Sequence, residues 1–190
     1  VEIPHMQALI NQKYASNLCG KLLLKKDSHL AIAGSVKARG GIYEVLKHTE
    51  ELAIEHGILM PHDIMNNSGT NAAYLKLAEP CARQLFGQYT IQVSSTGNLG
   101  ISIGMISAKI GYHTVVHMSA DAKQWKKDLL RNHGVKVVEY ESDYGEAVKN
   151  GRLKSAEDPR SYFVDDEMSK SLFLGYAVAA IRLENQLKQM

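Results

Sequence analysis

The sequence predicts an α/β protein whose parallel sheet is covered by helices on both faces, a three-layer α/β/α architecture. From residue 89 onward, short apolar runs alternate with amphipathic stretches of about 10–15 residues, a pattern typical of βαβ units. From residue 41, apolar residues recur at spacings of three and four, which indicates a helix with one buried face. With 45% hydrophobic and 22% charged residues among 190, the composition is that of a globular protein with room for one domain or two small lobes.

The second half of the chain gives the more regular prediction. Because connections between parallel strands are right-handed crossovers, the intervening helices should cover both faces of the sheet. The predicted strands are residues 89–94, 114–118, 135–140 and 161–164, and the predicted helices are residues 99–110, 121–133, 144–156 and 171–189.

The first half is less regular. Gly57 is a candidate C-cap, and the Asn, Ser and Gly residues that follow it favour a loop. The predicted elements are a helix-like segment over residues 1–20, a strand over 21–25 (KLLLK), a loop over 27–34, a helix over 41–57, a loop over 58–72 and a helix over 73–86.

Composition excludes several classes of protein. A formal net charge of +2 is too small to favour nucleic acid or an anionic membrane as a partner. No apolar run approaches the roughly 20 residues of a spanning helix, and no signal-peptide pattern opens the chain. Cys19 and Cys81 have no CxxC spacing, so no metal is expected. We expect them to be buried free thiols in a reducing compartment, which favours a cytoplasmic location.

One lysine stands in an unusual setting. Residues 34–41 (GSVKARGG) place Lys37 between small residues, directly before the predicted helix. Small neighbours let a flat, bulky group approach Lys37 Nζ, and the helix holds the backbone still. A fixed and accessible amine is what Schiff-base chemistry with an aldehyde cofactor requires. The alternative is an ordinary surface lysine.

A second candidate segment ends the first strand of the alternating half. Residues 94–100 (SSTGNLG) lie at the carboxyl edge of the predicted sheet, where open parallel sheets bind ligands. Ser95 or Thr96 can cap the next helix, whose first N–H groups attract an anion such as a carboxylate. Gly97 lets a ligand approach the backbone, and the Asn98 amide can donate to a phenolate or carbonyl oxygen. An ordinary capped βα turn would carry the same residues.

Acidic residues follow the last predicted strand at the same edge. Asp165, Asp166 and Glu167 could assist proton transfer or hold a cation, or they could simply place negative charge at a helix N-terminus. Two nucleotide-binding motifs are excluded. The glycines of residues 97–104 read GxxGxxxG instead of GxGxxG, and residues 34–37 lack Walker A spacing.

The chain resembles the D-serine dehydratase family, which belongs to the tryptophan-synthase-β-like group (fold type II) of pyridoxal-phosphate enzymes. The lysine and asparagine segments are shared by the wider group, whereas HMSADA, VVEYE and LFLGY point to the D-serine family. The stretches that carry the resemblance are LLLKKDSHL (22–30), GSVKARGGIYEVL (34–46), SSTGNLGISIG (94–104), VHMSADAKQWKK (116–127), HGVKVVEYESDYG (133–145) and DDEMSKSLFLGY (165–176).

The resemblance implies roles for individual residues. Lys37 would form the Schiff base with pyridoxal phosphate, and Asn98 would bond the cofactor's phenolate oxygen. The turn of Ser95, Thr96 and Gly97 would receive the substrate carboxylate, which agrees with the argument from the helix end.

The resemblance also implies a domain organisation. Residues 1–75 would form part of a large cofactor-binding domain, residues 76–168 a small α/β domain, and residues 169–190 a helix leading back to the large domain. The family's glycine-rich phosphate loop and the hydroxyl residue that meets the pyridine nitrogen have no counterpart in these 190 residues. We therefore expect the sequence to be the central part of a longer enzyme, with an incomplete site.

The implied activity is elimination of water and ammonia from D-serine, giving pyruvate, by a monomer or homodimer. Lys37 is the first candidate for moving the α-proton, and Asp165 or Asp166 could serve on the opposite face. Two alternatives stay open. One is a related enzyme acting on L-serine or threonine, or a β-replacing synthase. The other is a non-catalytic α/β ligand-binding module.

Overall fold

The computed structural model describes residues 1–65, 72–141 and 144–190. The polar residues 66–71, on which much of the loop prediction over 58–72 rests, lie outside the described residues. No described helix combines the length and the apolar character needed to cross a bilayer. No described group of three or more His, Cys, Asp or Glu side chains could hold a metal ion.

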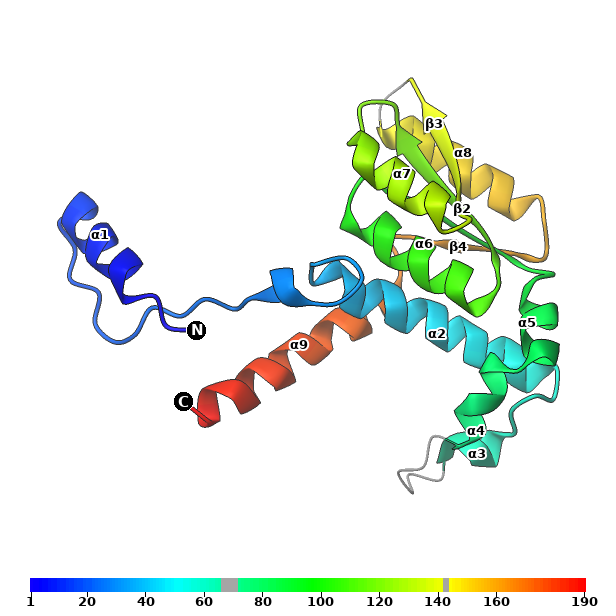
Figure 1. Cartoon of the computed structure of the whole chain (residues 1–190), viewed down its shortest axis with the longest axis horizontal. Helices are drawn as coiled ribbons and strands as arrows, with labels where there is room; N and C mark the ends of the chain where they lie inside the picture. The colour runs from blue at the N-terminus through cyan, green and yellow to red at the C-terminus, as the bar shows by residue number, and fades with distance from the viewer. Residues whose placement is uncertain (66–71, 142–143) are drawn as a thin grey trace.

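A four-stranded parallel sheet lies in the upper part of the molecule as drawn in Figure 1, above α2. Adjacent strands pair in parallel in the order β3-β2-β1-β4, so the first strand in the chain is central. The strands are β1 (Thr90–Ser94), β2 (His113–Ser119), β3 (Lys136–Tyr140) and β4 (Ser161–Val164). The strands predicted from the alternating pattern are confirmed.

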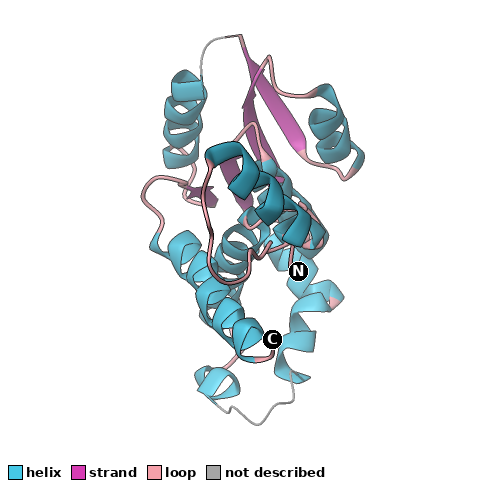
Figure 2. Ribbon diagram, turned by 90° about the vertical axis from the view of Figure 1, so that its left-hand side faces the viewer, coloured by secondary structure: helices cyan, strands magenta, loops and turns pink. Residues whose placement is uncertain are grey.

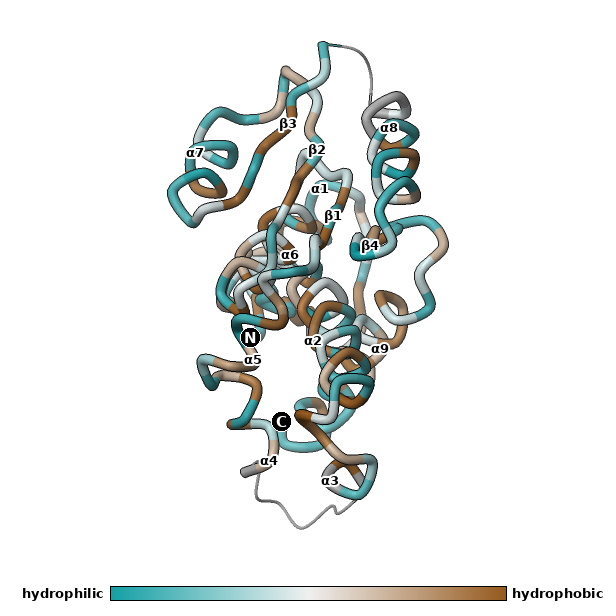
Figure 3. The backbone as a smooth tube through the Cα atoms, turned by 90° about the vertical axis from the view of Figure 1, so that its right-hand side faces the viewer, coloured by the Kyte–Doolittle hydropathy of each residue, from teal (hydrophilic) through white to brown (hydrophobic). Residues whose placement is uncertain are grey.

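Helices cover the sheet on both sides, which confirms the three-layer prediction. Helices α6 (Asn98–Ile110) and α7 (Gln124–Asn132) lie on one face and α8 (Tyr144–Ala156) on the other (Figures 2 and 3). Helix α2 (Lys37–Glu55) packs against α6, and α9 (Lys170–Lys188) packs against α2. The core is built from fully buried side chains of the sheet and these helices, including Ile91, Val93, Val45, Ile103 and Leu130.

Helix α1 (Pro4–Tyr14) agrees with the helix-like spacing of the first residues, but the strand predicted over 21–25 is wrong. The segment is extended and makes one antiparallel bridge, between Glu2 and Leu23. Leu24 N donates to Val1 O at 2.8 Å, yet the Leu24 side chain is 50% exposed. A single bridge without a third strand or a covered face does not make a stable sheet.

Proline breaks the helix predicted over 73–86 into pieces. They are α4 (Ala72–Leu75), a 3₁₀ turn (Lys76–Ala78) and α5 (Pro80–Phe86). Pro80 forces Glu79 into an extended conformation, with ψ of 154°, because the proline ring excludes the helical conformation of the residue before it.

Other boundaries also differ from the predictions. Helix α2 begins at Lys37, before its two glycines. Its C-cap residue is His56, one residue before the predicted Gly57, and Gly57 follows with a left-handed φ of +71° that favours glycine. A short helix, α3 (Pro61–Met65), lies within the predicted loop. Cys19 and Cys81 are free but exposed, so their predicted burial is wrong.

Candidate active site

Lys37 is the first residue of α2, where the chain leaves a tight turn. Gly34 has φ of +54°, a left-handed conformation that glycine adopts without strain. Ser35 closes the start of the helix, because its carbonyl accepts from Ala38 N at 3.1 Å and its hydroxyl accepts from Lys37 N at 3.3 Å. The Lys37 side chain is 38% exposed, so its amine is fixed at the base and accessible at the tip.

Two groups from the other end of the chain meet the Lys37 amine. Its Nζ donates to Asp166 Oδ1 at 3.3 Å and lies 5.1 Å from the centre of the Tyr176 ring. Asp166 follows β4, and Tyr176 lies on α9. The small residue Gly40 makes room for this ring, since a Cβ at Gly40 would lie 2.4 Å from Tyr176 Cε1.

The predicted anion-binding turn lies between β1 and α6. Ser95 N donates to His117 O at 2.9 Å, and the Ser95 hydroxyl accepts from Gly97 N at 3.2 Å. Gly97 is the N-cap residue of α6, and no side chain caps the helix, so the expectation that Ser95 or Thr96 caps it is wrong. An N-terminus without a side-chain cap leaves N–H groups for an external acceptor.

Helix packing brings the two predicted segments to the same end of the molecule. At one end of α2, a Cβ at Gly41 would lie 3.0 Å from Ile103 Cγ1 and 3.4 Å from Leu99 Cδ1, in the first turns of α6. At the other end, the Tyr112 hydroxyl donates to Thr49 Oγ1 at 3.0 Å. Helices α2 and α6 therefore run parallel, and both begin at the carboxyl edge of the sheet, α2 with Lys37 and α6 with Asn98.

The acidic turn after β4 contains carboxylates with different partners: Asp165 and Glu167 bind Arg152, whereas Asp166 contacts Lys37. Arg152 binds Asp165 through two hydrogen bonds of 2.8 Å and binds Glu167 Oε2 at 2.8 Å. These bonds hold the pKa of Asp165 below its usual range. Asp165 is therefore occupied in an ion pair, and Asp166 is the acidic residue of the turn that contacts Lys37.

Glu44 is the residue of this region that the sequence patterns missed. It is 2% exposed and accepts hydrogen bonds from the Tyr162 hydroxyl at 2.9 Å and the Ser169 hydroxyl at 2.6 Å. Burial raises its pKa. Its spacing of four from Gly40 and seven from Lys37 would have placed it on their side of the helix.

The family model described as "Pyridoxal-phosphate dependent enzyme" matches residues 8–190 of this sequence. The chain belongs to this family. Among curated relatives, a "Probable D-serine dehydratase" from Halalkalibacterium halodurans is 57% identical over 189 residues, and one from Aeromonas salmonicida is 57% identical over 190. The match covers 100% of this chain and 41% of each relative, so the chain spans less than half of their length.

Solved structures confirm the pyridoxal-phosphate enzyme fold. Apo diaminopropionate ammonia lyase from Escherichia coli superposes with a TM-score of 0.70 at 18% identity, covering 100% of this chain and 55% of that one. A fungal L-serine ammonia-lyase from Rhizomucor miehei gives 0.65 at 13% identity, covering 100% and 46%. At these identities the likeness concerns the fold alone.

The side chains at this edge fit the cofactor of a pyridoxal-phosphate dependent enzyme. Lys37 offers a primary amine to an aldehyde, and Asn98 offers an amide donor at the start of α6. A Cβ at Gly97 would meet nothing nearer than Ser95 Oγ at 4.0 Å, so space is open above the turn. The buried Tyr176 hydroxyl beside Lys37 has no partner among the described residues, and burial raises its pKa, so it stays a donor.

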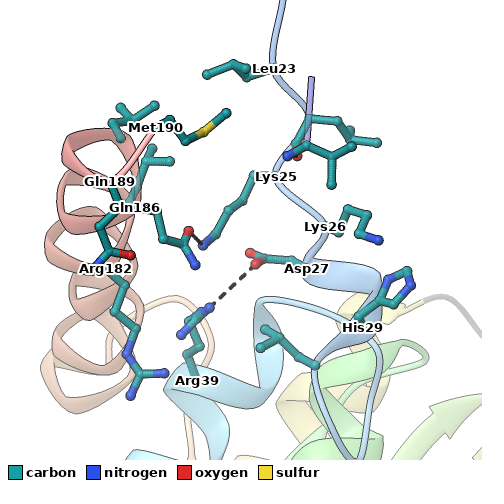
Figure 4. A pocket seen from close by; sticks show the side chains of 15 residues that line it. Leu23, Lys25, Lys26, Asp27, His29, Arg39, Arg182, Gln186, Gln189 and Met190 are labelled. Atoms are coloured by element: carbon teal, nitrogen blue, oxygen red, sulfur yellow. Dashed lines mark hydrogen bonds and ion pairs between the residues drawn. The ribbon is translucent and has the colours of Figure 1, made fainter. Parts of the chain in front are cut away.

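A pocket of about 890 Å³ lies away from the edge at Lys37 (Figure 4). It opens between the extended segment around Lys25 and the end of α9, and Arg39 reaches from α2 to Asp27 at 3.5 Å on its floor. Its described lining contains none of the predicted site residues. The candidate site is therefore the edge at Lys37, and the pocket belongs to another face.

Proposed function

We propose that the full-length protein converts D-serine to pyruvate and ammonia with pyridoxal phosphate. The identity of 57% across the whole chain to relatives named probable D-serine dehydratase carries this proposal. The geometry supports it, because a lysine amine and an uncapped helix N-terminus share one edge of the sheet. In the net reaction the α-proton and β-hydroxyl leave D-serine as water, which is taken up again when nitrogen is released as ammonia.

Two segments of this chain, residues 34–41 and 94–100, would hold the reactants. Lys37 Nζ would bond the aldehyde carbon of the cofactor, and the Asn98 amide would donate to its phenolate oxygen. The turn of Ser95, Thr96 and Gly97 and the first N–H groups of α6 would receive the substrate carboxylate. When bound, pyridoxal phosphate withdraws electrons from the substrate and makes its α-proton acidic.

The same edge offers two groups for moving that proton. The Lys37 amine is the first candidate, because it would be released beside the cofactor once the substrate amine replaces it. Asp166 is the candidate on another side, since its carboxylate lies 3.3 Å from Lys37 Nζ and, unlike Asp165, is not bound by Arg152. An amine and a carboxylate that both lie near the substrate's α-carbon would be suited to general acid–base catalysis.

The first experiment tests the cofactor lysine in the full-length protein. Lys37→Ala should abolish the visible absorption band of lysine-bound cofactor and lower kcat at least 100-fold, because no other amine would hold the aldehyde. Lys47→Ala is the matched control, since Lys47 lies on the same helix and pairs with Glu51 on the surface at 3.5 Å. A band that persists in Lys37→Ala would reject Lys37 as the cofactor lysine and with it the proposed site.

The second experiment tests the substrate. Pyruvate formation is measured with D-serine, L-serine and L-threonine at equal concentrations on the same full-length preparation. We expect kcat/KM for D-serine to exceed that for either L-amino acid at least 10-fold, a difference in transition-state binding of about 1.4 kcal/mol. Equal or greater activity on L-serine would favour the related L-serine or threonine dehydratase instead.

A further inference from the structure

Glu44 is a carboxyl group buried without a cation. It is 2% exposed, and the described residues provide it with no salt bridge. Both of its oxygens accept from hydroxyl groups, Oε1 from Tyr162 and Oε2 from Ser169. Burying a carboxyl group costs free energy. A buried glutamate that bonds two hydroxyl groups therefore suggests that these two hydrogen bonds have a role.

The partners of Glu44 come from the same elements that surround the Lys37 amine. Glu44 and Lys37 lie on α2, while Tyr162 lies on β4, directly before the turn with Asp166. Ser169 is the N-cap of α9, the helix that carries Tyr176. One side chain therefore ties together the three elements that meet at Lys37 Nζ.

Ser169 fixes one end of the turn that holds Asp166. Its hydroxyl donates to Glu44 Oε2 at 2.6 Å and accepts from Leu172 N at 3.0 Å, and its backbone N donates to Asp165 O at 3.0 Å. Arg152 fixes Asp165 and Glu167 from the other side. The position of Asp166 is therefore set by the residues held on both sides of it, Asp165 before it and Glu167 and Ser169 after it.

Glu44 does not reach the reacting groups itself. Seven residues along a helix place it about 10 Å from Lys37 along the axis. Tyr162, the second partner of Glu44, also stacks on His48 of α2, with ring centres 4.1 Å apart and planes at 16°. Glu44 and His48 therefore hold β4 against α2 at positions farther along the helix than the carboxyl edge of the sheet, where Lys37 lies.

We infer that Glu44 is a positioning residue, which anchors the turn of residues 165–169 so that Asp166 stays beside Lys37. This inference rests on the proposed function, because it assigns the turn a part in the reaction at Lys37. A residue that acts through another should lose its effect once that other residue is removed.

The kinetic test is a double-mutant cycle in the full-length enzyme. Glu44→Gln should lower kcat for D-serine roughly 10-fold, with KM changed less than about twofold, because only the proton-handling geometry is disturbed. In the Asp166→Asn background, Glu44→Gln should lower kcat no further. Effects that multiply in the double variant, or a loss confined to KM, would overturn the inference.

Glu50→Gln is the matched control for this cycle. Glu50 lies on the same helix and also accepts from a tyrosine hydroxyl, that of Tyr74, but far from the turn. Its replacement should leave kcat within about twofold. Ser169→Ala serves as a second variant, since it removes the link to the turn while Glu44 keeps its bond to Tyr162; it should reproduce the kcat loss of Glu44→Gln.

A structural readout separates this inference from the proposed function. In the full-length protein without cofactor, amide hydrogen exchange of a peptide covering residues 165–173 should quicken roughly 10-fold in Glu44→Gln and Ser169→Ala, and stay unchanged in Glu50→Gln. Unchanged exchange in the first two variants would overturn the anchoring role. If the wild type fails to consume D-serine, the proposed function is rejected while this exchange measurement still decides the anchor.

Discussion

His117 shows how a single buried residue makes stability depend on pH. It is 1% exposed on β2, where its Nδ1 lies 2.9 Å from the Tyr140 hydroxyl and its Nε2 lies 2.8 Å from Gln92 Oε1. Gln92 Nε2 donates to Ser161 Oγ at 2.9 Å, so its Oε1 is left to accept. The neutral imidazole fits both neighbours, donating to Gln92 and accepting from Tyr140.

Acid should therefore destabilise the folded chain. Burial, aided by the positive charges of Lys154 and Lys136, lowers the pKa of His117 from 6.5 to about 4. Below pH 6.5 the His117 imidazole is protonated in the unfolded chain but stays neutral in the folded chain. The free energy of unfolding therefore falls as the pH drops from 6.5 to about 4. We expect this residue to lower the free energy of unfolding by roughly 3 kcal/mol across that range. Urea unfolding at pH intervals between 6.5 and 4 measures the loss.

Two substitutions on β2 isolate the contribution of His117. His117→Gln should be less stable at pH 7 but should lose less stability between pH 6.5 and 4 than the wild type. His113→Gln replaces the exposed histidine that begins the same strand, so it should keep the wild-type pH dependence. An identical acid loss in wild type and His117→Gln would show that other groups cause it.

Residue types alone indicated part of the candidate site. Lys37 and Asn98 could be proposed because an amine among small residues and an amide at a strand end suggest their chemistry locally. Glu44 has one local signal, its spacing of seven from Lys37, but its role could not be proposed because its partners are 118 and 125 residues away in the chain. Several other glutamates occur on α2, a composition typical of a solvated helix face, so the burial of Glu44 is seen only in the packed structure.

At the scale of elements, periodicity predicted the regular half of the fold and packing decided the rest. The alternation after residue 89 predicted each strand and helix because every element there buries one face against its neighbours. The run over residues 21–25 has the composition of a strand, yet it forms only one bridge, because a strand depends on partners that its own sequence does not specify.

The parallel packing of α2 and α6 could also not be predicted from the sequence. From the sequence alone, the small residues around Lys37 predict room for a ligand. In the structure, Gly40 makes room for the Tyr176 ring of α9, and Gly41 makes room for Ile103 of α6. The glycines thus let three helices approach closely, and that approach brings Lys37 to the edge where α6 begins.

At the scale of the whole molecule, α9 is packed on one side only. Near its start, Leu172 is 2% exposed, and a Cβ at Gly175 would lie 2.7 Å from Arg39 O of α2. Phe173, directly after Leu172, is 67% exposed, and farther along Ile181 and Leu187 are 62% and 48% exposed. Figure 1 shows the end of α9 and the segment with α1 both reaching away from the sheet.

This asymmetry predicts unequal costs for two similar truncations on α9. Leu172→Ala removes buried contacts with the core and should lower the free energy of unfolding of the chain by about 2–5 kcal/mol. Ile181→Ala removes a side chain of equal size that is 62% exposed, so the change should stay within about 0.5 kcal/mol. Chemical denaturation of both variants measures the difference. Equal losses would mean that α9 is buried along its whole length in solution, which would contradict the one-sided packing that positions Tyr176 and the turn after β4 at Lys37.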